Sequence, residues 1–96
     1  MNIDYSRDAI ADLTAIHDYI ARDNSVAAST ITARIMQSIA MLADFPMAGR
    51  LGRVPHTREL PITRLPYFAV YRIGSETDLF ILAIVHTSRQ WPADGA

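Results

Sequence analysis

The feature that most constrains this fold is a change in hydrophobic period near the middle of the chain. Up to about residue 45, apolar residues recur at the three-to-four-residue spacing of an amphipathic helix. From residue 58 onward they follow the alternation, or the continuous apolar runs, of β-strands. The segment between the two, "FPMAGRLGRVPHT", is rich in glycine and proline, which interrupt both patterns. The chain is therefore predicted to fold as helices followed by a sheet.

Two helices joined by a short connection are predicted in the first half. Ser6 can cap the first helix and Asn24 or Ser25 the second, because their side-chain oxygens accept hydrogen bonds from the free amides of a first turn. The second helix is expected to run to about Phe45, before Pro46. Each helix has an apolar stripe predicted to face the core: Ile10, Leu13, Ile16 or His17, and Ile20 in the first, and Ile31, Ile35, Ile39 and Leu42 in the second.

Four strands are predicted, over Asn2 to Tyr5, Arg58 to Thr63, Tyr67 to Ile73 and Leu79 to His86. The element order is then β-α-α-β-β-β. This order predicts an α+β fold with a helical hairpin packed on one face of a roughly four-stranded, mainly antiparallel sheet. Half of the 96 residues are apolar, which is enough for one compact core, so residues 1–96 are predicted to form a single domain.

Composition argues against several kinds of site. The chain has no cysteine, and its histidines, His17, His56 and His86, lie far apart without acidic partners at metal spacing, so no metal site is expected. No nucleophile elbow or phosphate-binding loop is present, and no cofactor is expected. The N-terminus lacks the apolar core of a secretory signal, and no uninterrupted apolar stretch approaches the length of a membrane span. A soluble cytoplasmic protein without a membrane partner is expected.

Arginine is unevenly placed along a chain that has no lysine. The first 44 residues hold six acidic residues against three arginines, and the rest hold six arginines against four acidic residues. The stretch "RELPITRLPYFAVYR" places Arg58, Arg64 and Arg72 mostly at the ends of predicted strands. Long arginine stems can lie on apolar surface while the guanidinium groups line the rim of the sheet. The pattern indicates either a surface for carboxylate or phosphate groups or an ordinary solvated face of the sheet.

The element order and four sequence segments resemble the RelE/ParE superfamily of toxins from bacterial toxin–antitoxin modules. The segments are "DLTAIHDYIA" in the first helix, "LADFPMAGR" at the end of the second, "TRELPITRLPYFAVYRI" in the middle strands and "ILAIVHTSRQWP" at the end. The resemblance covers nearly the whole chain. It implies a small cytoplasmic toxin that arrests growth and forms a hetero-oligomer with a cognate antitoxin, whose extended or helical segment wraps the toxin.

The branches of this superfamily act on different targets. RelE-like members cleave mRNA on the ribosome with basic side chains and a C-terminal tyrosine, whereas ParE-like members inhibit DNA gyrase. When Tyr67 is matched to the tyrosine that opens the corresponding strand of RelE, the neighbouring catalytic arginine falls on Phe68. The two strand lysines fall on Glu59 and Pro61, the C-terminal arginine falls on Ser88, and the C-terminal tyrosine has no counterpart. The resemblance is therefore closer to the ParE branch, which implies gyrase inhibition without catalytic residues.

Two alternatives stay open at this point. Other mRNA-cutting branches use histidine, so a ribosome-dependent endoribonuclease would have His86 for acid–base chemistry and Arg58, Arg64 and Arg72 as phosphate contacts. The other alternative is a degenerate toxin that retains only antitoxin binding. Against the nuclease, nine arginines facing ten acidic residues are a poor supply of cations for binding ribosomal RNA.

The partner-binding surface is predicted from the basic second half of the chain. Trp91 can serve as a contact anchor or pack on the sheet as a core residue. Pro61 cannot donate to a strand ladder, so its strand is expected to have an unpaired edge that suits strand addition by an antitoxin. The residues predicted to contact the antitoxin or the target are Arg53, Arg58, Arg64, Arg72, His86, Arg89 and Trp91.

Overall fold

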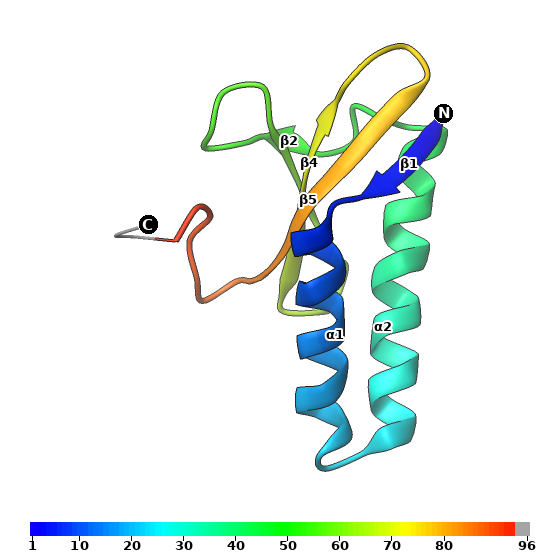
Figure 1. Cartoon of the computed structure of the whole chain (residues 1–96), viewed down its shortest axis with the longest axis vertical. Helices are drawn as coiled ribbons and strands as arrows, with labels where there is room; N and C mark the ends of the chain where they lie inside the picture. Colours follow the sequence, from blue (N-terminus) through cyan, green and yellow to red (C-terminus); the bar gives the residue numbers. More distant parts are fainter. Residues whose placement is uncertain (94–96) are drawn as a thin grey trace.

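Two antiparallel helices cover one face of a five-stranded sheet in the computed structural model, which describes residues 1–93 (Figure 1). The predicted α+β class and element order are confirmed, while residues 94–96 of the predicted domain lie outside the described residues. The elements are β1 (Asn2–Tyr5), α1 (Arg7–Ala21), α2 (Ser25–Ala40), a 3₁₀ turn (Met41–Ala43), β2 (Arg50–Leu51), β3 (Arg58–Pro61), β4 (Tyr67–Ile73) and β5 (Asp78–His86).

The strands are arranged in the order β1-β5-β4-β3-β2. β1 runs parallel to β5, and every other neighbouring pair is antiparallel. The prediction of about four strands missed β2, which pairs Arg50 with Glu59 and Leu51 with Arg58. A strand of two residues inside a glycine- and proline-rich segment carries no alternating pattern, so its pairing is set by β3 beside it.

Ser6 ends β1 and begins α1. Its backbone N–H donates to Ile81 O at 2.9 Å, and its hydroxyl accepts from Ala9 N at 3.0 Å, which confirms the predicted cap. The same hydroxyl donates to Leu82 O at 3.0 Å. One side chain therefore satisfies a free amide of the helix and a free carbonyl of β5, and it fixes where α1 leaves the sheet.

Asn24 caps α2, since its side-chain oxygen accepts from Ala27 N at 2.9 Å. The helix is shorter than predicted: it ends at Ala40, and the 3₁₀ turn then ends before Phe45. The backbone N–H groups of Asp44 and Phe45 both donate to Met41 O, which tightens the chain ahead of Pro46. By length and composition alone the segment Ser25–Ala43 would pass for a membrane span, and 22% of it is buried inside the molecule.

The main core lies between the helices and the sheet. Ile35 and Ile39 of α2 are fully buried, as the stripe predicted. Ile10 was predicted to be core but is 55% exposed, and Ala9 is fully buried in its place. The cap at Ser6 holds the first turn of α1 close to β5, so the residue that faces the sheet there is one position earlier and small.

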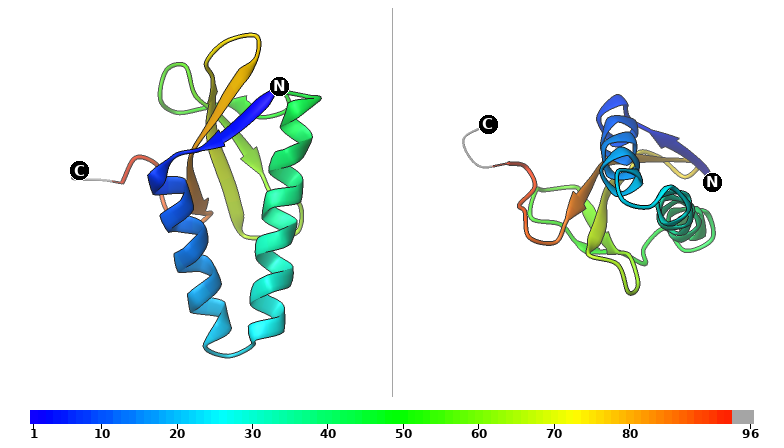
Figure 2. Two further views of the ribbon diagram at one scale, coloured as in Figure 1. Left: turned by 45° about the vertical axis from the view of Figure 1, so that its right-hand side comes forward. Right: turned by 90° about the horizontal axis from the view of Figure 1, so that it is seen from below.

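A bulge in β5 interrupts the alternation of its side chains between the two faces of the sheet. Val70 pairs with Ala83 and Tyr71 with Ile81, so Leu82 has no partner residue in β4. Ile81 and Ile84 both belong to the core beneath the helices as a result, although they are three positions apart and would face opposite sides in a regular strand. Figure 2 shows the helices on one side of the sheet, and Ile84 and His86, which follow the bulge, line a cavity with α1 on this side.

The opposite face of the sheet carries a second, smaller apolar cluster. Phe68 and Val70 of β4 pack there with Ala83 and Val85 of β5, and Trp91 lies against them half-buried. The segment after β5 therefore contacts, through Trp91, the face of the sheet that the helices leave open.

Smaller differences from prediction lie at strand ends. β3 ends at Pro61 and not at Thr63, because Ile62 N donates to Tyr67 O and closes a tight turn into β4. Arg64 in this turn has a φ of 64°, a left-handed conformation that is uncommon for a residue with a side chain.

Candidate partner-binding site

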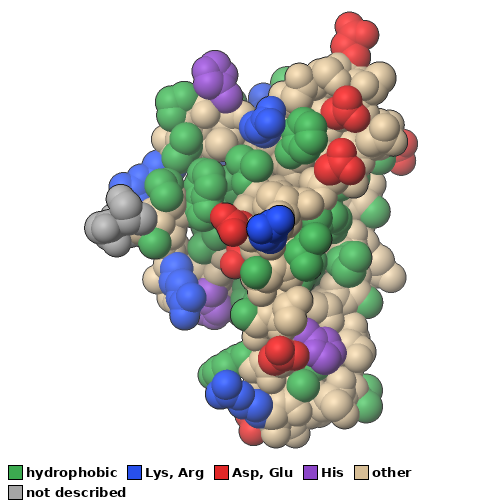
Figure 3. All heavy atoms as spheres, viewed as in Figure 1, with side chains coloured by type: hydrophobic (Ala, Val, Ile, Leu, Met, Phe, Trp, Pro, Cys, Tyr) green, Lys and Arg blue, Asp and Glu red, His purple; other side chains and the backbone are tan. Residues whose placement is uncertain are grey.

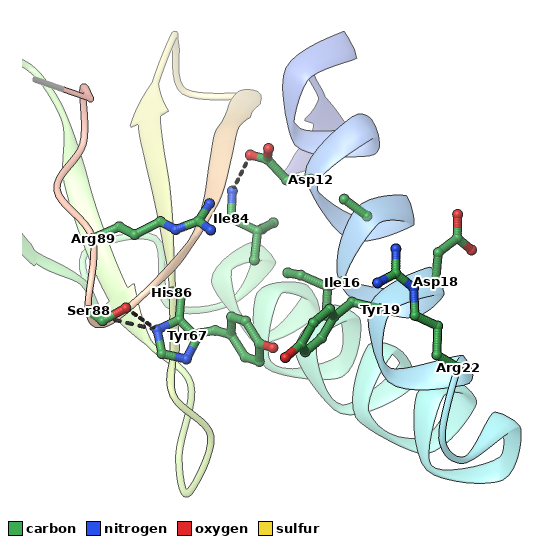
Figure 4. Close-up of a pocket in the computed structure, with 11 residues that line it drawn as sticks. Asp12, Ile16, Asp18, Tyr19, Arg22, Tyr67, Ile84, His86, Ser88 and Arg89 are labelled. Carbon is green, nitrogen blue, oxygen red and sulfur yellow. Dashed lines mark hydrogen bonds between the residues drawn. The ribbon is translucent and has the colours of Figure 1, made fainter. Parts of the chain in front are cut away.

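A cavity of about 710 Å³ lies between α1 and the end of β5 (Figure 4). The helices extend past the sheet at this end, so the cavity is walled by helix on one side and by the strand end on the other. Its polar lining comes from three parts of the chain: Asp12, Asp18, Tyr19 and Arg22 from α1, Tyr67 from β4, and His86, Ser88 and Arg89 from the end of β5 and the segment after it.

Asp12 connects α1 to the sheet at the cavity wall. Its Oδ2 accepts a hydrogen bond from the backbone N of Ile84 at 2.9 Å. Burial raises the pKa of the Asp12 carboxyl above its usual range, the Ile84 N–H opposes that rise, and the charge of Asp8 adds to it. The Asp12 carboxylate thus replaces a strand partner at the Ile84 N–H.

His86 is held in a defined orientation. Its Nδ1 accepts from the backbone N of Ser88 at 3.1 Å and lies 2.8 Å from the Ser88 hydroxyl. Its ring packs edge-on to Tyr67, with centroids 5.4 Å apart and planes at 88°. Because a backbone N–H donates to Nδ1, the proton of the neutral ring is on Nε2.

Two tyrosines mark the mouth of the cavity. Tyr19 on α1 is 69% exposed, and the Arg22 guanidinium lies 5.9 Å from the centroid of its ring. Figure 4 shows the side chains of Tyr19 and Tyr67 pointing toward each other across the opening. Exposed aromatic and arginine side chains of this kind are typical of protein contact surfaces.

Arg58 lies away from this cavity and supports the loop before β2. Its Nη1 donates to Gly49 O at 2.8 Å. Tyr71 binds the same loop, because its hydroxyl donates to Pro46 O and accepts from Gly49 N, both at 2.8 Å. The predicted partner-binding role of Arg58 stays a prediction, but this guanidinium also has a structural partner.

Arg64 and Arg72 are exposed and lie at opposite ends of β4. Arg72 packs over the ring of Phe80, 4.5 Å from its centroid. It lies five residues along β4 from Tyr67, which pairs with His86, so the two sites are separated by about 17 Å of strand. The structure therefore does not bring Arg58 or Arg72 to His86, and Arg64, in the turn before Tyr67, is not part of the cavity lining.

Arg53 and Trp91 belong to the face of the sheet opposite the helices. The Arg53 guanidinium donates to the side-chain oxygen of Gln90, and the Arg53 backbone N donates to the Glu59 carboxylate at 3.3 Å. Trp91 packs on the small cluster behind the sheet. Of the residues predicted to bind partners, only His86 and Arg89 line the cavity between α1 and β5.

The edge predicted at Pro61 is partly covered. β2 pairs with Arg58 and Glu59, so β3 is not the outermost strand, and Pro61 lies beyond the two paired positions. Charges of both signs are scattered over the face drawn in Figure 3, without a single broad basic patch. Within residues 1–93, no three His, Asp or Glu side chains lie close enough together to hold a metal ion.

Asp12, Tyr19 and Tyr67 were not predicted as site residues. The sequence places Tyr67 at the start of a predicted strand and Asp12 within the first predicted helix, and neither residue belongs to a motif that is typical of a site. The feature of the sequence that could have indicated Asp12 is an acidic residue next to the apolar stripe of α1, nearly two turns after the cap. That position becomes informative only when β1 is known to be shorter than β5.

Comparison with known proteins assigns the chain to one family. Residues 3–91 match the family model described as "ParE toxin of type II toxin-antitoxin system, parDE". The chain is 39% identical over 84 residues to the Y4kP protein of Sinorhizobium fredii, covering 88% of this chain and 85% of that protein. It is 36% identical over 81 residues to "Toxin RelE2" of Caulobacter vibrioides, covering 84% and 89%.

A solved structure shares the fold. It is described as "Chromosomal ParDE TA system from P. aeruginosa", and it superposes with a TM-score of 0.79 at 30% identity over 90% of this chain and 95% of that one. The family predicted from the sequence is confirmed by these matches, and a toxin–antitoxin system implies a cognate antitoxin as partner. The chain belongs to the ParE family of toxins from type II toxin–antitoxin systems.

Proposed function

We propose that this toxin arrests growth by binding and inhibiting DNA gyrase in the cytoplasm, and that its cognate antitoxin neutralises it by covering the binding surface. The observation that carries the proposal is the match of residues 3–91 to the ParE toxin model. The resemblance to the ParE branch, whose members inhibit gyrase, supports the choice of target.

The placement of the arginines supports a binding role over chemistry. Cleavage of RNA needs an acid, a base and a cation around one phosphate. Arg58 holds a backbone carbonyl, Arg72 stacks on Phe80, and Arg53 binds Gln90, so these three serve different parts of the surface. A recognition surface can be spread over the molecule in this way, whereas a catalytic centre cannot.

The test is a supercoiling assay with purified gyrase and added toxin. We expect loss of supercoiling with accumulation of cleaved DNA, and restoration by an equimolar amount of the antitoxin. A variant with Arg64→Ala, Arg72→Ala and Arg89→Ala should be at least about tenfold weaker, because exposed arginines contribute contact energy at interfaces. Arg7→Ala, an exposed arginine on α1, is the matched control. Full supercoiling at saturating toxin contradicts the proposal.

A second candidate, a ribosome-dependent endoribonuclease, is favoured by one observation. The cavity brings the oriented His86 together with Tyr67, Arg22 and Arg89, which are groups able to transfer protons and bind phosphate. Cleavage of ribosome-bound mRNA within codons, lost in His86→Ala and retained in His56→Ala, would establish this function in place of gyrase inhibition. Normal growth, intact messages and active gyrase would instead identify a toxin that keeps only antitoxin binding.

A further inference from the structure

β5 is much longer than the strand beside it. It spans Asp78–His86, whereas β1 spans only Asn2–Tyr5 and pairs with β5 from Asp78 to Ile81. After Tyr5 the chain turns into α1 and leaves the plane of the sheet. The outer edge of β5 from Leu82 to His86 therefore has no strand next to it among residues 1–93.

Side chains of the first helix satisfy part of this edge. Ser6 Oγ donates to Leu82 O at 3.0 Å, and Asp12 Oδ2 accepts from Ile84 N at 2.9 Å. Thr87 N donates to Pro66 O at 2.9 Å, on the β4 side. Because backbone groups alternate along a strand, the C=O of Ile84 and the N–H of His86 point outward, to the side that Asp12 occupies. His86 O accepts from Arg89 N at 2.9 Å and so is already bonded.

This edge lies at the bottom of a groove. The cavity of about 710 Å³ and a second one of about 350 Å³ share Asp12, Ile84, His86 and Arg89 in their linings. The second cavity continues the first along β5, between Ala11 of α1 and the segment that carries Trp91. Backbone groups of a strand edge with an open groove in front of them form the setting in which an extended peptide adds to a sheet.

We propose that the antitoxin adds a short extended segment to the free half of β5, running parallel to it and in line with β1; this rests on the proposed neutralisation of the toxin by an antitoxin. In parallel pairing, one incoming residue donates its N–H to the C=O of one strand residue and accepts from the N–H two positions later. Opposite Val85, those two groups are Ile84 C=O and His86 N–H.

Asp12 determines the direction of the added segment. An antiparallel strand would need both the N–H and the C=O of a single β5 residue. At Ile84 the N–H is held by Asp12, and at His86 the C=O is held by Arg89 N. Only a parallel segment uses the Ile84 C=O together with the His86 N–H, the two groups that these contacts leave without a partner in the described part of the chain.

The charge of Arg89 indicates that the added segment carries an acidic side chain. Arg89 lines both cavities and is exposed, while the Asp12 carboxylate on the opposite wall already accepts from Ile84. An acidic side chain in the segment can therefore pair with Arg89 without displacing an existing contact. The expected ligand is an extended peptide with an Asp or Glu next to the residue that pairs at Val85.

Amide hydrogen exchange of the full chain, free and bound to its antitoxin, tests the site. We expect exchange at His86 to slow by at least about tenfold in the complex, because its N–H gains a partner. Exchange at Ile84, already bonded to Asp12, should change much less. Nuclear Overhauser contacts at Val85 should show parallel pairing. An antitoxin that binds while the His86 amide exchanges as before contradicts the site and leaves the proposed function standing.

A variant that fills the groove gives an independent readout. Ala11 lines the second cavity and is exposed, so Ala11→Phe should block the segment and weaken antitoxin binding by at least about tenfold. Ala33→Phe, at an exposed position on α2, is the matched control and should change the affinity less than about twofold. Equal affinity in both variants contradicts the groove. Failure of the unmodified, folded toxin to bind the antitoxin at all contradicts both the neutralisation and this inference.

Discussion

At the scale of single residues, Tyr71 is the side chain that ties the irregular part of the chain to the sheet. It is fully buried on β4, and its hydroxyl bonds both Pro46 O and Gly49 N. Gly49 lies so close that an added Cβ would stand 2.6 Å from a ring carbon of Tyr71. The loop before β2 is thus positioned by the side chain of Tyr71 and by Gly49, which has no side chain and so allows the close approach.

Removing the Tyr71 hydroxyl should destabilise the protein. Tyr71→Phe keeps the ring but leaves Gly49 N–H and Pro46 C=O without their partner, which is expected to lower the free energy of unfolding by about 1–3 kcal/mol. Urea denaturation measures the change. Tyr19→Phe, at a position that is 69% exposed, should stay within about 0.5 kcal/mol of the parent. Equal stability of the two variants would show that the hydroxyl contacts are replaced by water.

Asp12 should make stability depend on pH. Its pKa is raised from the ordinary 3.8, chiefly by burial, so the folded state binds the proton more tightly than the unfolded chain. Its contribution is fully present below pH 3.8 and is lost as pH rises through the folded pKa. Asp12→Asn lacks this titration. The parent should lose stability relative to Asp12→Asn in urea denaturation as pH rises from the ordinary pKa of 3.8 toward neutrality. A constant difference across this range would contradict it.

At the scale of elements, the junction of β1, α1 and β5 depends on one hydroxyl. Ser6→Ala removes the cap of α1 and the bond to Leu82 O, at an expected cost of about 1–2 kcal/mol. Asn24→Ala removes only a cap, that of α2, and should cost about 1 kcal/mol or less. Ser29→Ala, exposed within α2, is the control and should be neutral. Thermal unfolding of the three variants measures their relative stabilities. A smaller loss of stability for Ser6→Ala than for Asn24→Ala would contradict the double role of the Ser6 hydroxyl.

Elements with a repeating pattern were predictable from the sequence, and elements without one were not. Both helices and the strands Asn2–Tyr5 and Tyr67–Ile73 follow from periodicity and capping residues. β2 has two residues and no pattern, and it exists because β3 pairs with it. The bulge at Leu82 could not be predicted from the sequence either, because "LFILAIV" is apolar on both faces and is compatible with either register.

At the scale of the whole molecule, the arginines of the second half do not form one rim. Arg58 supports a loop, Arg72 stacks on the ring of Phe80, and only Arg89 of the predicted arginines lines the groove along β5. The candidate site was predictable only in part for this reason. Composition indicates that a basic surface exists, but its assembly depends on contacts between segments that are distant in the sequence.

This dispersion predicts different effects for different arginines. Arg58→Ala should lower the free energy of unfolding by about 1 kcal/mol, because Gly49 O loses its donor. Arg64→Ala, in the exposed turn before β4, should leave stability within about 0.5 kcal/mol. Binding measurements on Arg58→Ala therefore need a stability measurement beside them. Equal melting temperatures for the two variants would contradict the structural role of Arg58.

The unmatched residue at Leu82 has a consequence for how this toxin can vary. A substitution changes the side chain at a position, but it does not change the face of the sheet to which that position points. Deleting Leu82 would restore a regular alternation and keep Val70 opposite Ala83 and Tyr67 opposite His86, so His86 would stay on the helix side and Val85 behind the sheet. The side on which His86 lies is thus set by its pairing with Tyr67 of β4, and one residue fewer at the bulge would leave it unchanged.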